Sequence, residues 1–367
     1  AMSLYGKGFM IWQLARCENG NGVEVARVAR AAGLSHVLIK IADGPYTYNV
    51  DRTTRVDLVP PVVQELKKNR IQAWGWHYVY GSNPVGEAQM AAQRVNELGL
   101  DGYVIDAEVE YKQPGREQAA KAFMAELRKR IPNTPVALCS YRFPVLHPQL
   151  PWKAFLDYCD YNMPQVYWQA AHNPADQLRR CVNEFKNLAP FRPIMPTGPV
   201  YSAGGWVPTE SEMVEFLDAV REHNLPSVNF FAWDYGRKGL IALWNKIAAY
   251  PHPIGPQPAD IPEQYFSLLN ANKPAAIANL YTDDAVHITA SKTVQGKEAI
   301  QTWHKNFLTN SFPNATFEIT SVSGTGSTRT FTWKGVSPTR GKIENGNDTI
   351  GLIDGKIAYH YKYFKIT

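Results

Sequence analysis

The chain has 367 residues, of which 45% are hydrophobic and 19% are charged, and this composition is typical of folded globular domains. The net charge is +5, but Lys and Arg are spread along the chain without a basic block, which argues against nucleic-acid binding. No stretch reaches the ~18 consecutive apolar residues of a membrane span. We therefore expect neither a nucleic-acid partner nor a membrane partner.

The four cysteines, Cys17, Cys139, Cys159 and Cys181, are widely spaced and form no CxxC pair. This spacing favours reduced thiols in the core over a zinc site, and no metal or other cofactor is expected. The first nine residues, AMSLYGKGF, contain no apolar secretory segment. If Met2 is the native start, a cytoplasmic protein is expected, whereas a trimmed signal peptide would mean secretion.

Strand-like and helix-like segments alternate over the first 250 residues. The expected strands are nearly continuous apolar runs, as is typical when helices cover both faces of a parallel sheet. Helical patterns such as VEVARVARAAG and REQAAKAFMAELRKRI separate them. The expected strands are 8–14, 36–44, 71–81, 101–108, 135–142, 159–168, 192–201 and 228–236. Eight units in about 250 residues predict a (β/α)8 barrel at 1–250, with a doubly wound sheet as the alternative.

Proline marks the end of this region. Residues 248–264, AAYPHPIGPQPADIPEQ, contain five prolines and one glycine, so they predict a linker, assigned to 251–261. Residues 262–367 then show two short helices, a strand, a third helix and four further strand-like stretches. This order predicts an α+β domain with a curved antiparallel sheet.

Polar and aromatic residues gather at the predicted carboxyl ends of the barrel strands, where this fold places active sites. Aromatic rings and acids together are typical of a carbohydrate site. The residues expected to bind substrate there are Asp43, His77, Tyr78, Tyr141, Gln165, Tyr167, Trp233, Asp234 and Tyr235. For Trp233, a plain core position is an equal alternative.

The segment DGYVIDAEVEY, residues 101–111, carries the expected chemistry. Asp106 and Glu108 are two residues apart on a strand and therefore share one face. Two close carboxylates resist joint ionisation, so one pKa should rise, and a protonated carboxyl can act as a general acid. We assign Glu108 as the acid and Asp106 as the group that orients the substrate. The plain alternative is a solvated rim of acids that binds nothing.

Several of these segments resemble glycoside hydrolase family 25, the lysozyme-type muramidases. The similar segments are HVLIKIADG, GWHYVYG, VIDAE and FFAWDY. DGYVIDAE and YNMPQVYW also resemble family 18 chitinases. The resemblance implies a retaining, substrate-assisted mechanism in which the 2-acetamido group of the sugar attacks the anomeric carbon. Met10 stands where family 25 carries an aspartate, which leaves open a substitute carboxylate at Asp43 or Asp234, a different substrate, or binding without cleavage.

The C-terminal region resembles SnoaL-like, nuclear-transport-factor-2-like (NTF2-like) domains, in the segments LYTDDAVHI, GKEAI and IDGKIAYHYKYF. The resemblance implies a cone-shaped fold with an internal pocket. It also implies ligand binding or dimerisation, while catalytic relatives use an Asp/His pair. The expected pocket residues are His287, Trp303, Trp333, Asp348, His360 and Tyr361.

The sequence therefore predicts a glycosidase that cleaves glycans of N-acetylated amino sugars, of the peptidoglycan or chitin type, joined to a SnoaL-like domain. The alternatives are a non-catalytic glycan-binding barrel and a small-molecule enzyme of the SnoaL type. The expected partners are a carbohydrate and a second copy of the chain, bound through the C-terminal domain.

Overall fold

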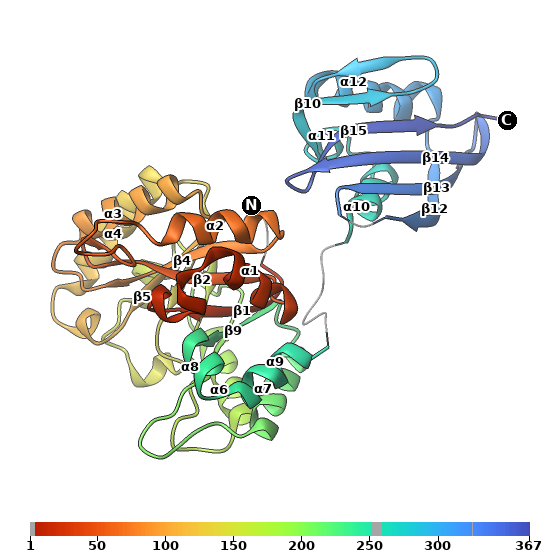
Figure 1. The fold of residues 1–367 in the computed structure, drawn as a ribbon. Coiled ribbons are helices and arrows are strands. Elements are labelled where there is room, and N and C mark those ends of the chain that lie inside the picture. The colour runs from red at the N-terminus through yellow and green to blue at the C-terminus, as the bar shows by residue number, and fades with distance from the viewer. Residues whose placement is uncertain (1–3, 252–258, 325) are drawn as a thin grey trace. The chain divides into compact units, whose positions relative to one another are not determined.

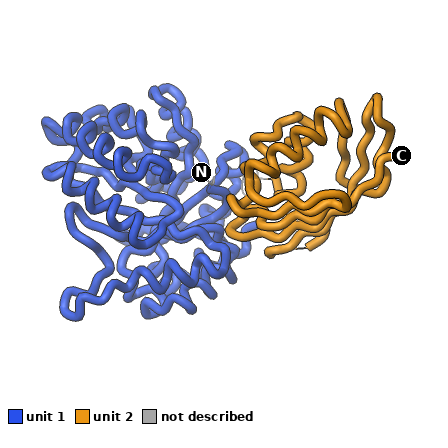
Figure 2. Tube along the Cα trace, turned by 90° about the horizontal axis from the view of Figure 1, so that it is seen from above, with its two compact units in different colours: residues 1–257 blue, residues 258–367 orange. Residues whose placement is uncertain are grey.

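The computed structural model describes residues 4–251, 259–324 and 326–367, and the chain divides into two compact units, residues 1–257 and 258–367 (Figure 2). The division falls inside the predicted linker. Residues 252–258, most of that linker, lie outside the described part of the chain. Each unit has its own hydrophobic core.

The first unit is a mixed α/β structure with a curled parallel sheet and helices outside it (Figure 1). The sheet order is β7-β6-β5-β4-β2-β1-β9-β8, with the short β3 (Tyr46–Thr47) paired antiparallel to β2. Its parallel strands are β1 (Gly6–Ile11), β2 (His36–Asp43), β4 (Gln72–Val79), β5 (Gly102–Ala107), β6 (Val136–Cys139), β7 (Tyr161–Asn162), β8 (Thr197–Pro199) and β9 (Ser227–Phe231). Two isolated parallel bridges, Asn162 with Ile194 and Gln165 with Thr197, lie beyond this ladder.

Helices follow most of these strands. Many begin at residues that favour a helix start; for example, the Asn83 side chain accepts a hydrogen bond from the backbone of Gly86, and Pro84 is the first helical residue. The helices are α1 (Gly22–Ala31), α2 (Val59–Lys68), α3 (Pro84–Leu98), α4 (Arg116–Arg130), α5 (Trp152–Leu156), α6 (Pro174–Lys186), α7 (Glu210–Glu222), α8 (Trp233–Lys238) and α9 (Ile241–Ala249). Short 3-10 turns include η1 (Leu14–Arg16) and η3 (Val109–Lys112).

Alternate strand residues supply two separate cores. One set packs between the sheet and the helices, and the other fills the inside of the curl. The inner set includes Met10, Leu38, Trp74, Trp76 and Val104. All four cysteines are buried with free thiols, as the sequence predicts.

The strand expected at residues 228–236 is only partly correct. Strand β9 ends at Phe231, and α8 begins at Trp233, so the segment WDYG lies in a helix. The aromatic residues of that segment suggested a strand, but their packing is that of a short helix against β1 and α9.

The second unit has a six-stranded sheet in the order β11-β10-β15-β14-β13-β12, with β10 parallel to β15 and the other neighbours antiparallel. Its helices are α10 (Ile261–Asn270), α11 (Pro274–Ala278) and α12 (Lys297–Asn306). Its strands are β10 (Tyr281–Ile288), β11 (Thr293–Gln295), β12 (Thr316–Ser323), β13 (Thr328–Ser337), β14 (Gly341–Ile353) and β15 (Lys356–Tyr363). Helices come first in the chain and the long antiparallel strands last, as predicted.

Candidate functional site

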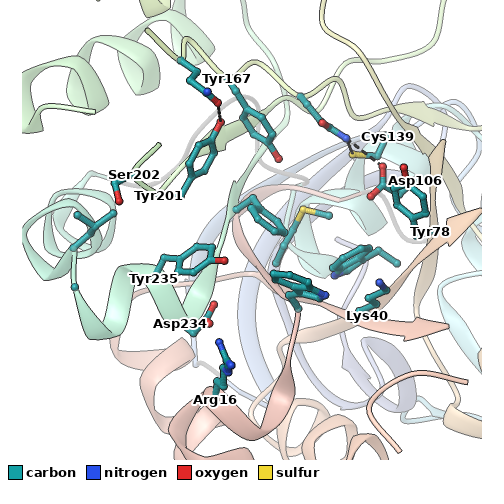
Figure 3. Close-up of a pocket in the computed structure, with 18 of the residues that line it drawn as sticks. Arg16, Lys40, Tyr78, Asp106, Cys139, Tyr167, Tyr201, Ser202, Asp234 and Tyr235 are labelled. Carbon is teal, nitrogen blue, oxygen red and sulfur yellow. Dashed lines mark hydrogen bonds between the residues drawn. The ribbon is translucent and has the colours of Figure 1, made fainter. Parts of the chain in front are cut away.

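A cavity of about 1060 Å³ lies where the strands of the first unit end (Figure 3). It is lined by aromatic rings and by both acidic and basic side chains. The lining residues are Met10, Trp12, Arg16, Lys40, Trp76, Tyr78, Asp106, Glu108, Cys139, Gln165, Tyr167, Gln169, Tyr201, Ser202, Phe231, Asp234, Tyr235, Lys238, Gly239 and Leu240. Asp106 and Glu108 both line it, so the two acids share a face as expected.

One amide side chain holds the two carboxylates together. Gln165 Nε2 donates to Asp106 Oδ1 at 3.2 Å and to Glu108 Oε1 at 2.8 Å. Asp106 is the next-to-last residue of β5, whereas Glu108 follows the strand and precedes η3. Asp106 is buried and Glu108 is half-buried. The outer acid is therefore open to the cavity, and the inner acid is almost sealed from water.

Burial raises the pKa of Asp106 well above its usual range, and the neighbouring Glu108 carboxylate raises it further. The Lys40 ammonium acts in the opposite direction. A raised carboxyl pKa was expected for this pair, and in the structure it belongs to the inner acid.

Tyrosines surround the acid pair. Tyr78 Oη donates to Glu110 Oε2 at 2.7 Å, and burial together with this hydrogen bond raises the pKa of Tyr78. Glu110 lies beyond β5, is half-buried and accepts the hydrogen bond of this phenol. Tyr167 meets Tyr201 edge to face at 5.4 Å, and Figure 3 shows the Tyr167 ring reaching into the cavity.

Four residues expected to bind substrate do not line the cavity. Asp43 Oδ1 accepts from Tyr80 Oη at 3.0 Å and lies 3.4 Å from Lys40 Nζ. His77 is fully buried, and its ring nitrogens contact a tyrosine hydroxyl at 2.7 Å and a backbone carbonyl at 2.6 Å. Tyr141 stacks on His147 at 3.8 Å. His77 points away from the cavity because it lies between the cavity-lining Trp76 and Tyr78 on β4, and alternate strand residues face opposite sides of a sheet.

The fourth is Trp233, which lies in the core and is not a platform for sugars. It has no exposed surface, and its ring packs against Phe9 and Trp244 at centroid distances of 6.4 and 4.9 Å. Its Nε1 donates to Glu18 Oε1 at 3.2 Å. Its neighbours Asp234 and Tyr235 do line the cavity, because α8 turns them to the opposite side.

The sequence reasoning missed the basic residues of the cavity. Arg16 belongs to η1, and Lys238 is the last residue of α8. Both lie beyond strand ends, outside the positions that strand periodicity can identify. Met10 lines the cavity as well and gives its floor an apolar side chain.

A buried polar network occupies the interior of the second unit. Asp348 accepts hydrogen bonds from Trp333 Nε1 at 2.8 Å, His360 Nε2 at 2.6 Å and Lys362 Nζ at 2.9 Å. His360 Nδ1 also contacts Tyr281 Oη at 2.6 Å. Burial tends to raise the pKa of Asp348, but the Lys362 ammonium and the His360 hydrogen bond outweigh it and lower the pKa.

The other predicted pocket residues of this unit differ in position. His287 is buried, and neither of its ring nitrogens has a hydrogen-bond partner. Trp303 is only partly buried and contacts the His287 ring at 4.4 Å. Tyr361 is 58% exposed, because it alternates with the inward-facing His360 and Lys362 on β15, so its assignment to the pocket is wrong.

Within residues 4–251, 259–324 and 326–367, no group of three or more His, Cys, Asp or Glu side chains is arranged to hold a metal ion. None of the helices in those ranges is long and apolar enough to cross a membrane.

Residues 263–360 match the family model of the SnoaL-like domain. The second unit is a SnoaL-like domain. The match begins in α10 and ends in β15, so it spans almost the whole SnoaL-like domain. A search of curated proteins found no match.

Solved structures that are similar to part of this chain include NTF2-like and ketosteroid isomerase-like proteins. One is an NTF2-like protein of unknown function from Cytophaga hutchinsonii, which is 11% identical and aligns over 29% of this chain and 87% of its own, with a TM-score of 0.25. Another, from Catenulispora acidiphila, is a hypothetical protein with a ketosteroid isomerase-like fold in complex with trimethylamine. It is 16% identical over 30% of this chain and 88% of its own, with a TM-score of 0.27.

Proposed function

We propose that the first unit is a glycoside hydrolase that cleaves glycans of N-acetylated amino sugars. The observation that carries the proposal is the carboxylate pair, Asp106 and Glu108, joined by the Gln165 amide inside a cavity lined with aromatic rings. The position of the pair at the carboxyl end of β5 agrees with the active-site location of (β/α)8 enzymes. The resemblance to glycoside hydrolase families 25 and 18 supports the same reaction class.

We propose that the curled sheet is a closed (β/α)8 barrel. Each of its eight main strands pairs in parallel with the next along the observed order. The isolated bridges from Asn162 to Ile194 and from Gln165 to Thr197 run between the two ends of that order, which supports closure. Gln165 would then belong to the short strand that closes the barrel.

In the proposed reaction, the acetamide oxygen of the sugar attacks the anomeric carbon while the bond to the leaving oxygen breaks. Glu108 gives its proton to that leaving oxygen. The ionised Asp106 accepts a hydrogen bond from the acetamide N–H and stabilises the positive charge of the cyclic intermediate. Water then attacks the anomeric carbon, the acetamide leaves, and Glu108 recovers a proton, so the configuration is retained.

The proposed reaction requires an ionised Asp106 and a protonated Glu108. Burial and the Glu108 carboxylate raise the pKa of Asp106. A bound acetamide N–H would donate a hydrogen bond to Asp106, which favours the ionised form of that carboxyl and lowers its pKa. Binding of the substrate would therefore favour the ionised Asp106 that the reaction needs.

The alternative function is glycan binding without cleavage. Met10 lines the cavity where family 25 carries a carboxylate. Asp234 also lines the cavity, whereas Asp43 does not, so Asp234 is the candidate for a substitute carboxylate.

For the SnoaL-like domain, we propose ligand binding or dimerisation and not a second active site. The Asp348 carboxylate is fully engaged by three donors and has a lowered pKa, so it is a weak base. Outward-facing tyrosines on β15 offer a surface for a second copy, namely Tyr359, Tyr361 and Tyr363.

The test is turnover of labelled N-acetylglucosamine oligomers and labelled peptidoglycan by the wild-type protein and by Glu108→Gln. Loss of a general acid lowers the rate by ~10²–10⁴. Glu117→Gln, on the exposed surface of α4, is the matched control and should keep the wild-type rate. Cleavage that is unaffected by Glu108→Gln would refute the assignment of the acid. Binding without any cleavage would favour the alternative.

A further inference from the structure

The SnoaL-like domain carries all three of its histidines in one buried cluster. His287 on β10 and His360 on β15 are in register on neighbouring strands, and His304 comes from α12. The centroid of the His287 ring lies 5.1 Å from that of His304 and 4.8 Å from that of His360. None of the three side chains is exposed. These three residues form the histidine cluster, which takes no part in the proposed chemistry of the first unit.

The hydrogen bonds of two rings in the cluster are satisfied when those rings are neutral. His304 Nδ1 donates to a carbonyl of its own helix at 2.8 Å, and its Nε2 lies 2.7 Å from Tyr265 Oη. His360 Nε2 donates to Asp348 Oδ2 at 2.6 Å, and its Nδ1 lies 2.6 Å from Tyr281 Oη. In each ring one nitrogen thus carries a proton for an acceptor, and the other can accept from a phenol.

The third ring, His287, has no group that would stabilise a positive charge. Neither of its nitrogens has a hydrogen-bond partner, so a protonated ring would bury two N–H donors without an acceptor. The groups whose charge acts on it are His360, His304 and Lys362, and all three are cations when charged. Each of them therefore opposes protonation of His287.

The carboxylate that faces the cluster is already neutralised. Asp348 lies 2.9 Å from the ammonium of Lys362, and both side chains have no exposed surface. Burial lowers the pKa of His304 from 6.5 to about 3, although its backbone hydrogen bond and Asp348 act in the opposite direction. Burial also lowers the pKa of His287 and of His360. The folded domain therefore excludes protons that its unfolded chain takes up below about pH 6.5.

We propose that the SnoaL-like domain is an acid-triggered conformational switch, which is folded near neutral pH and unfolds at mildly acid pH before the first unit. The proposal does not depend on the proposed function of either unit. Because unfolding lets three histidines bind protons, the unfolding equilibrium constant should rise about a thousandfold for each pH unit below about 6.5. Small domains have folding equilibrium constants of about 10³–10⁸, so half of the molecules should be unfolded at a pH between about 5.5 and about 4.

The first unit should respond less steeply to acid. Its fully buried histidines in the described residues are His36 and His77, so its unfolding constant should rise about a hundredfold for each pH unit. The other histidines that the structure describes in this unit are at least partly exposed, namely His147, His172 and His223. The first unit is also the larger of the two, and larger domains bury a greater fraction of their surface. These differences favour opening of the SnoaL-like domain first.

Peptide-resolved hydrogen–deuterium exchange of the full chain follows the two units separately. Exchange is measured at several pH values between about 4.5 and about 6.5 and is corrected for the intrinsic exchange rate of each amide. The protection factors of amides in β10 and β15 should fall about a thousandfold for each pH unit, and those in β2 and β4 about a hundredfold.

His287→Phe is the variant that tests the cluster. It removes one of the three titrating groups and no hydrogen bond, so the protection factors in β10 and β15 should now fall about a hundredfold for each pH unit. His172→Gln replaces an exposed histidine of the first unit and is the matched control, which should keep the thousandfold dependence of the SnoaL-like domain.

Three results would overturn the switch. Protection factors in the SnoaL-like domain that fall no more steeply with pH than those of the first unit would reject it. A thousandfold dependence that persists in His287→Phe would exclude the histidine cluster as its cause. The third result needs no variant: nuclear magnetic resonance of the chain with isotope-labelled histidine would show the rings becoming protonated near pH 5 while the domain stays folded.

Discussion

Replacement of Asp348 by alanine should strongly destabilise the SnoaL-like domain. The carboxylate accepts from three buried donors, and the Lys362 side chain has no exposed surface. Its loss would leave a buried ammonium without a counter-charge, which costs about 3–5 kcal/mol. In a domain of about 100 residues, 1 kcal/mol corresponds to roughly 4–8 °C, so the melting temperature should fall by roughly 12–40 °C.

Differential scanning calorimetry of the full chain measures this effect. If the two units unfold separately, only one transition should move in Asp348→Ala. The double variant Asp348→Ala/Lys362→Met removes the stranded charge and should recover more than half of the loss. Glu344→Ala breaks the exposed pair with Lys334 and is the control, with an expected change below about 1 kcal/mol.

The pH dependence provides a second check on the same residue. The lowered pKa of Asp348 means that its ionisation stabilises the fold at all pH values above the unfolded value of 3.8. This contribution is lost as the pH falls through the folded pKa, so the difference between the wild-type protein and Asp348→Ala should narrow there. The reasoning would be refuted if Asp348→Ala lowered the free energy of unfolding by less than about 1 kcal/mol at neutral pH. It would also be refuted if the double variant were no more stable than Asp348→Ala.

Three further predictions concern the first unit. Burial lowers the pKa of His36 and of His77 from 6.5 to about 4. As the pH falls from 6.5 to 4, only the unfolded state gains these protons. Urea titrations should therefore show that the free energy of unfolding falls by about 1.4 kcal/mol per pH unit for each histidine. A free energy of unfolding that does not change over this pH range would contradict the prediction. Gln165→Leu removes the amide that donates to both carboxylates. A hydrogen bond to a charged group is worth about 1.5–3 kcal/mol, so kcat/KM should fall about tenfold to a hundredfold. An unchanged kcat/KM would exclude a role for the amide. Gly102→Ala places a methyl group 2.3 Å from the Trp74 ring and should cost about 1–3 kcal/mol by chemical denaturation, whereas wild-type stability would show that the ring can move.

The strands of both units could be predicted because apolar runs and alternation follow directly from burial. The runs at 36–44 and 71–81 became β2 and β4 with ends displaced by one or two residues. The run at 159–168 became only the two-residue β7, because Pro164 and irregular pairing interrupt it. The proposed closure of the sheet rests on isolated bridges, which leave no pattern in the sequence.

The acid pair could be predicted for a different reason. Its two residues are two positions apart at the end of β5, so the alternation of the strand places them on the same side. The orientation of Trp233 could not be predicted, because it depends on a helix that begins two residues after β9. Arg16 and Lys238 were missed because they meet only in the folded cavity, more than two hundred positions apart in the chain. Pairing preferences between such distant segments are not visible in one sequence.

Gln165 reaches the acid pair from 57 positions beyond Glu108. The chain between them forms η3, α4, β6, α5 and β7, and only Cys139 of this stretch lines the cavity. Insertions in the outer loops of that stretch would therefore leave the carboxylates and their amide unchanged. The architecture thus separates the two carboxylates and their amide from loops that can vary in length without disturbing them.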